Sequence, residues 1–405
     1  MPFGPILAAM RRNKFGAILI AVQMAVTLAF IANSFALIEQ RLLWSSRATG
    51  VDERNVFVIR GGSIATHEDL EARLKGDVAA LRELPGVLDA YITNDYPLEG
   101  GGWSEGVLLN PDQKTSTASA AHYFGDEHAL NSLGLKLIAG RDFTASEVTA
   151  RPDNSPTEAK VYIVSKALAD SLFPKGDALG KTVYVEDNAP TQIIGIVEQL
   201  QTPFFAATGQ TVKYAENSFI EPVFPLSEFP RFVVRAQPGQ LNSLMKRAEA
   251  LLLQRDSDRI LKTQSMEEVR AQAYRGNHGL VVLLVSVCTA LLVVTGFGII
   301  GLTSYWVTLR RQQIGIRRAL GATRLNIVQY FQTENLLIAA SGALAGVALA
   351  IMLNLWMVDH FEMVRMADSR ALIGAFVLLL LGQAAVFWPA LRAASIPPAL
   401  ATRGG

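Results

Sequence analysis

The sequence predicts an α-helical membrane protein with four transmembrane helices and a large extracytoplasmic α/β domain between the first two. Three observations indicate this fold class. Four stretches lack Asp, Glu, Lys and Arg, and each is long enough to cross a bilayer, which needs roughly 20 mostly apolar residues. About 240 residues of mixed polar sequence separate the first two stretches. Arginine and lysine gather beside particular ends of the stretches, as the positive-inside rule requires of a membrane protein.

The charge-free stretches are Phe15–Ile38, Gly279–Leu309, Asn335–Val358 and Ala371–Leu391. The first imitates a signal peptide, but its apolar region of about 24 residues exceeds the usual 7–15, which favours an uncleaved span. The predicted layout is 1–14 cytoplasmic, 15–38 span one, 39–278 outer domain with stalk helices, 279–309 span two, 310–326 cytoplasmic helix, 327–358 span three, 359–370 outer loop, 371–391 span four and 392–405 cytoplasmic tail.

Charge placement predicts the orientation of these spans. Basic residues precede span one, separate spans two and three, and follow span four: Arg11, Arg12, Lys14, Arg310, Arg311, Arg317, Arg318, Arg324, Arg392 and Arg403. Because Lys and Arg accumulate in short cytoplasmic loops, both termini and the 310–326 segment are expected in the cytoplasm. The net charge of +1 says nothing about nucleic acid, but the lack of a basic stripe interleaved with aromatics argues against it as a partner. The single cysteine, Cys288, excludes a disulfide within the chain.

The segment Arg310–Asn326 carries five arginines and no acidic residue. Each arginine at the bilayer centre would cost about 2.5–3.5 kcal/mol, so the segment is expected at the membrane surface. Its apolar residues recur at helical spacing, Gly321 fits a left-handed helix end, and Thr323 is a candidate N-cap for the next helix. The alternative is a loop whose arginines only orient the protein, and contact with anionic lipid fits either interpretation.

The order of residues in "LRRQQIGIRRALGATRLNIVQYFQTENLLIAASGALAGVALAI" resembles the signature of permeases of the MacB/FtsX-like branch of ABC transporters (type VII, mechanotransmission-type). Gln313 stands where that family usually has Glu, and Glu334 falls where it often has an acidic residue. The resemblance implies a coupling helix that docks on a cytoplasmic ATPase. The implied coupling residues are Gln313, Ile314, Gly315, Ile316, Arg317, Arg318, Ala319, Leu320, Gly321 and Ala322.

The resemblance implies that the protein has a mechanical function. The chain would be a non-catalytic permease subunit in the bacterial inner membrane, without a cofactor of its own, and ATP and Mg would bind the partner ATPase. ATP hydrolysis would move periplasmic domains and drive export or extraction of a peptide, antibiotic, toxin or lipid-linked substrate. A second permease copy, a periplasmic adaptor, an outer-membrane channel and membrane lipid are the further implied partners. The alternative is a FtsX-like or sensory subunit that controls a periplasmic or cytoplasmic partner.

The outer domain is bracketed by two β-α-β patterns. The first runs from "NVFVIR" through a helix near 67–84 to "VLDAYIT", and the second from "RFVVRA" through a helix near 240–255 to "RILKTQ". Equivalent units at both ends predict one split α/β subdomain with a second subdomain inserted at about 100–228. The insert is rich in Gly, Pro and Thr and is expected to consist of loops with short strands. Its motifs resemble the periplasmic domain of the same family, in which a porter-like part carries a mixed α/β insert.

Three motifs in this domain resemble catalytic, metal-binding or phosphate-binding motifs. Gly102–Gly106 fits G-x-S-x-G around Ser104, but the strand-then-helix context of a nucleophile elbow is missing. His122 and His128 flank two acidic residues without the spacing of a zinc pair, which predicts a solvated helix start and no metal site. Gly176–Thr182 is one residue shorter than a P-loop and lies in the outward domain, away from ATP.

Polar and small residues inside the spans favour helix packing. Gly342, Gly346 and Ala350 give span three a smooth face for close helix approach. The polar residues of the charge-free stretches are expected to face protein and to form hydrogen bonds between helices: Gln23, Asn33, Asn354 and Gln383. Since these stretches hold no ionisable pathway residue, the sequence argues against a secondary transporter.

Overall fold

The computed structural model describes residues 14–63, 69–152, 159–185, 189–205, 213–361 and 365–395. The chain forms two compact units. The membrane unit comprises Met1–Trp44 and Asn277–Gly405, and the outer unit comprises Ser45–Gly276. A single segment inserted between the first two long helices therefore forms a compact unit of its own, which confirms the predicted fold class.

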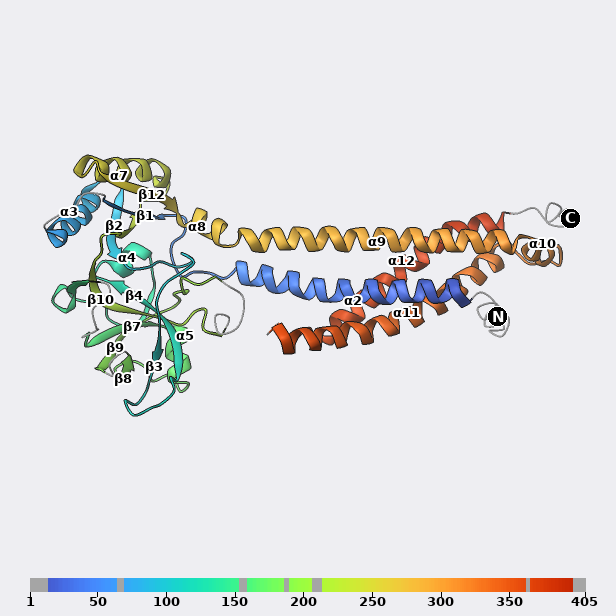
Figure 1. Ribbon diagram of the computed structural model, residues 1–405, viewed down its shortest axis with the longest axis horizontal. Helices are drawn as coiled ribbons and strands as arrows, with labels where there is room; N and C mark the ends of the chain where they lie inside the picture. The colour runs from blue at the N-terminus through green and yellow to red at the C-terminus, as the bar shows by residue number, and fades with distance from the viewer. Residues whose placement is uncertain are drawn as a thin grey trace. The chain divides into compact units, whose positions relative to one another are not determined.

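The membrane unit is built on four long apolar helices (Figure 1). Their bounds are α2 Lys14–Ser45, α9 Arg275–Leu309, α11 Arg324–Phe361 and α12 Asp368–Ala394. By length and composition, each of the four is able to cross a membrane. Every one of these helices is longer than its charge-free stretch, because helix-compatible polar residues continue it at one or both ends.

These four helices pack around a shared apolar core. Ile20, Met24 and Leu28 of α2 are almost completely buried and meet Ile299 of α9 and Ile338 of α11 in that core. Many side chains on the remaining faces are exposed and apolar, as expected of helices that contact lipid. The arrangement leaves a short helix, α10 Arg311–Ala319, between the end of α9 and the start of α11.

In the outer unit, the two bracketing β-α-β patterns fold into one four-stranded sheet, which confirms the split subdomain. Its strand order is β12-β1-β11-β2 and all three pairings are antiparallel. This βαββαβ pattern is that of a ferredoxin-like subdomain with an insertion between its halves. The elements are β1 Val56–Ser63, α3 Leu70–Glu83, β2 Val87–Thr93, β11 Arg231–Ala236, α7 Leu241–Arg255 and β12 Arg259–Ser265. The predicted position 67 lies outside the described residues.

Helices α3 and α7 cover one face of this sheet (Figure 1). Alternate strand residues such as Phe57 and Phe232 point into the core that they form with Leu74 of α3 and Leu244 of α7. The intervening residues of the strands, including Arg60 and Arg231, therefore lie on the opposite face of the sheet. α8 Met266–Ala273 follows β12 and ends just before α9 begins.

The inserted segment corrects one expectation. In place of loops with short strands, it forms an eight-stranded mixed sheet of order β3-β4-β10-β7-β9-β5, with β6 on β10 and β8 on β9. Its elements are β3 Ser104–Val107, β4 Ala118–Gly125, α4 Ala129–Leu133, β5 Leu137–Gly140, the 3-10 turn Ala145–Glu147, β6 Thr149–Pro152, β7 Val161–Ser165, α5 Lys166–Leu172, β8 Thr182–Val185, β9 Ala189–Val197 and β10 Ser218–Leu226. Strands β4 and β10 are buried on both faces, so they lack the alternation that marks a half-exposed strand.

Candidate coupling site at the arginine-rich helix

The ends of α10 are formed as the sequence predicts. Gly321 adopts the left-handed conformation with φ of 99°, and Ala322 N donates to Arg317 O at 3.0 Å. Thr323 Oγ1 accepts a hydrogen bond from Asn326 N at 3.2 Å, which caps the start of α11. The helix is therefore a separate, well-defined element between two long helices.

One face of α10 is packed against the membrane unit. Ile314 is 5% exposed and belongs to the core cluster that contains Ile327 and Phe331 of α11 and Ala390 of α12. Gly315, the next residue, is also buried. These contacts attach α10 to two of the long helices, so it is not a loose loop between spans.

A buried ion pair holds the start of α10. Arg310 Nη1 donates to Glu334 Oε2 at 2.7 Å and to Oε1 at 3.0 Å, and both residues are buried. The Arg317 guanidinium lies 4.8 Å from the centre of the Tyr330 ring, one helical turn before Glu334 on α11. Two arginines of the arginine-rich segment are thus bound to one face of α11.

The opposite face of α10 exposes apolar side chains. Ile316 on α10 is 47% exposed, and Leu320, the residue directly after the helix, is 84% exposed. Gln312, Gln313 and Ala319 share this exposed surface. Exposed apolar groups rimmed by polar ones are typical of a protein-protein interaction site. We call the group of Gln312, Gln313, Ile316, Ala319 and Leu320 the docking face.

The ten residues that the family resemblance singled out therefore divide between two faces. Ile314 and Gly315 are buried, Arg318 and Ala322 are half-buried, and the others are exposed. Sequence reasoning missed Tyr330 as a partner of Arg317, and it did not pair Arg310 with Glu334. The spacing of Tyr330 and Glu334, four residues apart on one helix, is the signal that places both on a common face.

The small residues of α11 lie against α2. A Cβ atom added at Gly342 would stand 2.7 Å from Ala21 O, and one at Gly346 would stand 3.0 Å from the Cα of Ala25. Ala350 is completely buried, and its carbonyl oxygen accepts from Asn33 Nδ2 at 3.1 Å. The two backbones approach so closely that a Cβ atom at Gly342 would force a shift of the α2 backbone, and one at Gly346 would make a tight contact with it.

Polar side chains of the spans form hydrogen bonds between helices. Asn354 Nδ2 donates to Asn33 Oδ1 at 3.2 Å, which joins α11 to α2. Gln23 Nε2 donates to Thr295 Oγ1 of α9 at 3.5 Å. Gln383 of α12 accepts from Gln332 Nε2 through its backbone oxygen at 3.2 Å. The expected interhelical side-chain bonds are therefore formed by Gln23, Asn33 and Asn354, whereas the side-chain Nε2 of Gln383 is buried without a hydrogen-bond partner among the described residues.

The structure places Ser104 at the first position of β3, with a loop before it. No helix follows directly, so the strained turn of a nucleophile elbow is not formed there. The P-loop-like segment is equally unsuited to phosphate: Gly176 and Gly180 lie in turns, and Thr182 begins strand β8, where a P-loop would begin a helix.

The expectation of a solvated helix start at the two histidines is wrong for His122. His122 lies inside β4, is 1% exposed, and its Nε2 is 2.6 Å from Glu221 Oε2. His128 does precede a helix, but its Nδ1 lies 2.9 Å from Asp89 Oδ1. Since the histidines face different carboxylates, they do not converge on a common ligand, and the described residues contain no cluster of metal-ligating side chains.

Comparisons with known proteins agree with this architecture. The model of the MacB-like periplasmic core domain matches residues 17–251, and that of the FtsX-like permease C-terminal region matches residues 285–398. The macrolide export ATP-binding/permease protein MacB of Chromobacterium violaceum is 27% identical over 352 residues, covering 86% of this chain and 52% of that protein. The MacB of Neisseria gonorrhoeae is 24% identical over 385 residues, covering 94% and 56%.

Among solved structures, the periplasmic region of MacB from Actinobacillus actinomycetemcomitans matches with a TM-score of 0.33 and 18% identity, covering 55% of this chain and 94% of that one. The chain spans about half the length of the curated relatives it matches. The MacB-like core model alone covers more than half of the chain, and the FtsX-like model covers the arginine-rich segment and most of the last three spans. The chain therefore belongs to the MacB/FtsX-like family of ABC transporter permeases.

Proposed function

We propose that this chain is a permease subunit that converts ATP hydrolysis by an ATP-binding partner into motion of its outer unit, and so drives export of a substrate. The partner binds ATP and Mg, and it docks on the exposed face of α10. A second permease copy completes the assembly, because one docking face serves one ATP-binding domain. The curated relatives are named as macrolide exporters, which supports efflux as the direction of transport.

The single observation that carries this proposal is the two-sided construction of α10. Its docking face offers Ile316 and Leu320 to a partner, while its inner face is fixed to the long helices by Ile314 and by the Arg310–Glu334 pair. A helix that is both exposed and rigidly attached transmits a push from a partner to the elements behind it. A purely topogenic loop would need neither feature.

Contacts at the other end of the membrane unit support transmission along α2. Arg370 of α12 pairs with Glu39 at 2.7 Å, and Arg41 Nη1 donates to Asn277 Oδ1 of α9 at 3.0 Å. The end of α2 from which the chain continues into the outer unit is thus tied to two neighbouring helices. A displacement of the helix bundle at that end therefore moves α2 and α9 together.

Within the outer unit, the two segments that continue these helices are tied to each other. Arg270 of α8 donates to the backbone oxygens of Ser45 and Arg47, both at 2.8 Å, and its Nε donates to Glu53 Oε2 at 2.7 Å. Burial raises the pKa of Glu53, but the hydrogen bonds from Arg270 and Thr49 outweigh it and hold that pKa below its usual value. The ion pair is therefore kept at neutral pH and joins both connections of the domain.

The experiment measures ATP hydrolysis by the partner in the presence and absence of the reconstituted full-length permease. Replacing Ile316 and Leu320 together by Glu is expected to reduce the permease-dependent stimulation by about tenfold or more, because burial of two apolar side chains at the interface is lost. Gly315→Pro should also abolish it, since proline inside a helix costs about 3 kcal/mol. The matched control is Leu179→Glu, which places the same charge at an exposed leucine of the outer unit.

Unchanged stimulation in the Ile316/Leu320 double variant would contradict docking on this face. Export is tested separately, by loading the substrate into cells with and without the protein. A chain that stimulates its ATPase but leaves substrate accumulation unchanged would be a signalling subunit, not an exporter.

A further inference from the structure

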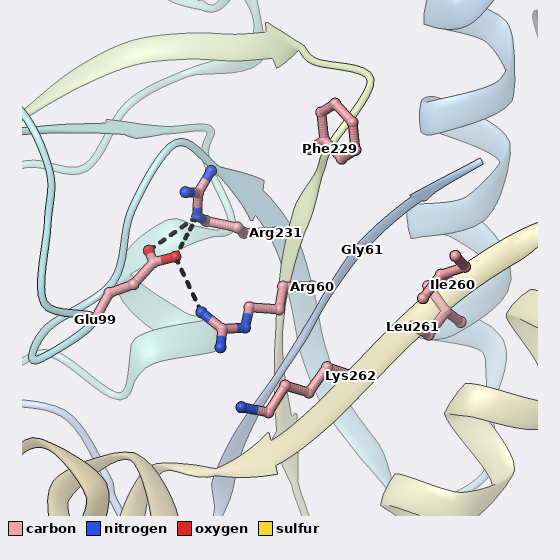
Figure 2. Close-up of a pocket in the computed structure, with 8 residues that line it drawn as sticks. All are labelled: Arg60, Gly61, Glu99, Phe229, Arg231, Ile260, Leu261 and Lys262. Carbon is pink, nitrogen blue, oxygen red and sulfur yellow. Dashed lines mark hydrogen bonds and ion pairs between the residues drawn. The ribbon is translucent and has the colours of Figure 1, made fainter. Parts of the chain in front are cut away.

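A small cavity lies at the end of β1 in the outer unit, on the four-stranded sheet (Figure 2). Its volume is about 310 Å³, near the lower limit for a small-molecule site. Among the described residues, eight line it: Arg60, Gly61, Glu99, Phe229, Arg231, Ile260, Leu261 and Lys262. Neither the docking face nor the helix packing of the membrane unit involves this cavity.

Three cations stand side by side in the wall of the cavity. In the sheet register, Arg60 of β1 lies opposite Arg231 of β11 on one side and opposite Lys262 of β12 on the other. Like charges directly opposite one another destabilise a sheet unless something compensates them. This row is therefore a costly arrangement that folding alone does not require.

Only part of this charge is compensated within the described residues. Glu99 reaches the row from the β2–β3 loop, accepts from Arg231 Nε at 2.7 Å and lies 3.7 Å from Arg60 Nη1. Lys262 is exposed and has no acidic partner among the residues that the structure describes. Nearby Glu228 lies 3.6 Å from Arg73 and is paired there. Three cations thus share one carboxylate.

The second acid of the loop adds little negative charge. Burial raises the pKa of Asp95 to about 8, and a hydrogen bond and repulsion from Glu99 act in the same direction. The raised pKa lowers the negative charge that Asp95 contributes beside the cations. The cationic row retains an excess of positive charge that a bound anion would neutralise.

The same cavity has an apolar side. Figure 2 shows Arg60, Arg231 and Glu99 on one side of the β1 ribbon at Gly61 and Ile260 and Leu261 on the other. Lys262 extends from β12 across β1 toward Arg60, and Phe229 lies on the same side of β1 as Arg231. Phe229 is 69% exposed and Ile260 is 68% exposed, more than any other large apolar side chain described in the outer unit. Gly62 lets the Phe229 ring lie against β1, because a Cβ at that position would stand 2.7 Å from the ring.

We propose that this cavity binds a single-chain anionic amphiphile. Its oxyanion head group lies at Arg60, Arg231 and Lys262, where the two guanidinium groups supply planar pairs of donors. Its apolar chain passes over Gly61 and covers Phe229 and Ile260. This site goes beyond the proposed coupling function and does not depend on it.

The test measures binding of hexyl phosphate by calorimetry to the full chain in zwitterionic nanodiscs, with empty nanodiscs subtracted. Lys262→Ala is expected to weaken binding by about threefold to tenfold, as loss of one partly exposed charge pair predicts. Phe229→Ala should weaken it as well, through the apolar chain. The matched control is Lys246→Ala, an exposed lysine on α7 at the helix-covered side of the sheet, which should bind as the unsubstituted chain does.

Two further ligands test the contributions of the anionic head group and of the apolar chain separately. Inorganic phosphate and neutral hexyl glucoside should each bind much more weakly than hexyl phosphate, because each offers only one of the two features. Equal binding of inorganic phosphate would overturn the apolar half, and equal binding of hexyl glucoside would overturn the anionic half. Hexyl phosphate binding that is the same in Lys262→Ala and in Lys246→Ala would overturn the site altogether. Thermal unfolding of each variant verifies that the fold is retained.

Discussion

Between α2 and α11 of the membrane unit, the backbones approach until Gly342 leaves no room for a side chain and Gly346 only a tight space. In the outer unit, large apolar side chains such as Phe57 and Leu244 fill the space between the sheet and its helices. Water drives apolar side chains together in the outer unit, whereas lipid tails give no such advantage to helices that associate in a membrane. Close backbone contact and a few polar bonds replace large side chains where the solvent is lipid.

The largest expected effect concerns the buried ion pair of the membrane unit. Glu334→Gln should lower the free energy of unfolding by about 3–5 kcal/mol, because it leaves the buried Arg310 charge without its partner. Unfolding of the full chain in detergent measures this change, and the permease-dependent ATPase activity should fall with it. Replacing both Arg310 and Glu334 by Leu should cost less than the single change, since no buried charge remains. A Glu334→Gln protein with unchanged unfolding would show that the pair does not hold α10.

In the outer unit, replacing a large buried side chain by a smaller one should destabilise the fold more than adding a side chain would. Leu244→Ala is expected to lower the free energy of unfolding by about 2–5 kcal/mol, because Leu244 is completely buried and its loss leaves a cavity. The control is Leu109→Ala, at an exposed leucine, where a change within about 0.5 kcal/mol is expected. Similar losses at both positions would mean that the sheet-helix core does not dominate the stability of this unit.

In the membrane unit, replacing a small residue at a helix contact by a larger one should be the destabilising change. Gly342→Leu is expected to cost about 1–3 kcal/mol, since the new side chain would collide with the α2 backbone. Gly279→Leu provides the matched control, because a Cβ there meets nothing within 4 Å. Thermal unfolding of the two variants in the same detergent compares them directly. Equal melting temperatures would contradict a close α2–α11 contact.

A separate effect is a dependence of the free energy of unfolding on pH that originates at Asp95 in the outer unit. The pKa of Asp95 is raised to about 8 by burial and by Glu99, so the folded chain holds a proton that the unfolded chain releases near pH 4. The contribution of this group is therefore complete below about pH 4 and is lost as the pH rises through about 8, with a slope of at most about 1.4 kcal/mol per pH unit.

Asp95→Asn keeps the group neutral and should remove this part of the pH dependence. The measurement is the free energy of unfolding of both proteins at several pH values between 5 and 8, and the difference between them isolates Asp95 from Asp142, whose pKa burial raises to about 6. Parallel curves for the two proteins would show that Asp95 ionises normally in the folded state.

The candidate site was accessible to sequence reasoning only in part. The motif around Ile314–Ala322 located α10, and Gly321 and Thr323 marked its end and the start of α11. The family resemblance drew attention to Glu334, but its partner Arg310 is on a different element. Pairing across elements depends on how helices pack, and helix spacing along one element does not report it.

The sequence by itself determined the four spans, because charge-free apolar stretches of this length match the thickness of a bilayer. It also determined the two β-α-β units through their periodicity. Only the tertiary structure decided that strands β4 and β10 are buried on both faces, and that His122 joins Glu221 within them. It also decided that Arg60, Arg231 and Lys262 form one row. The physical reason is that lipid solubility and strand alternation are local properties of the chain, whereas strand order and cross-strand register bring together residues as distant as Arg60 and Lys262.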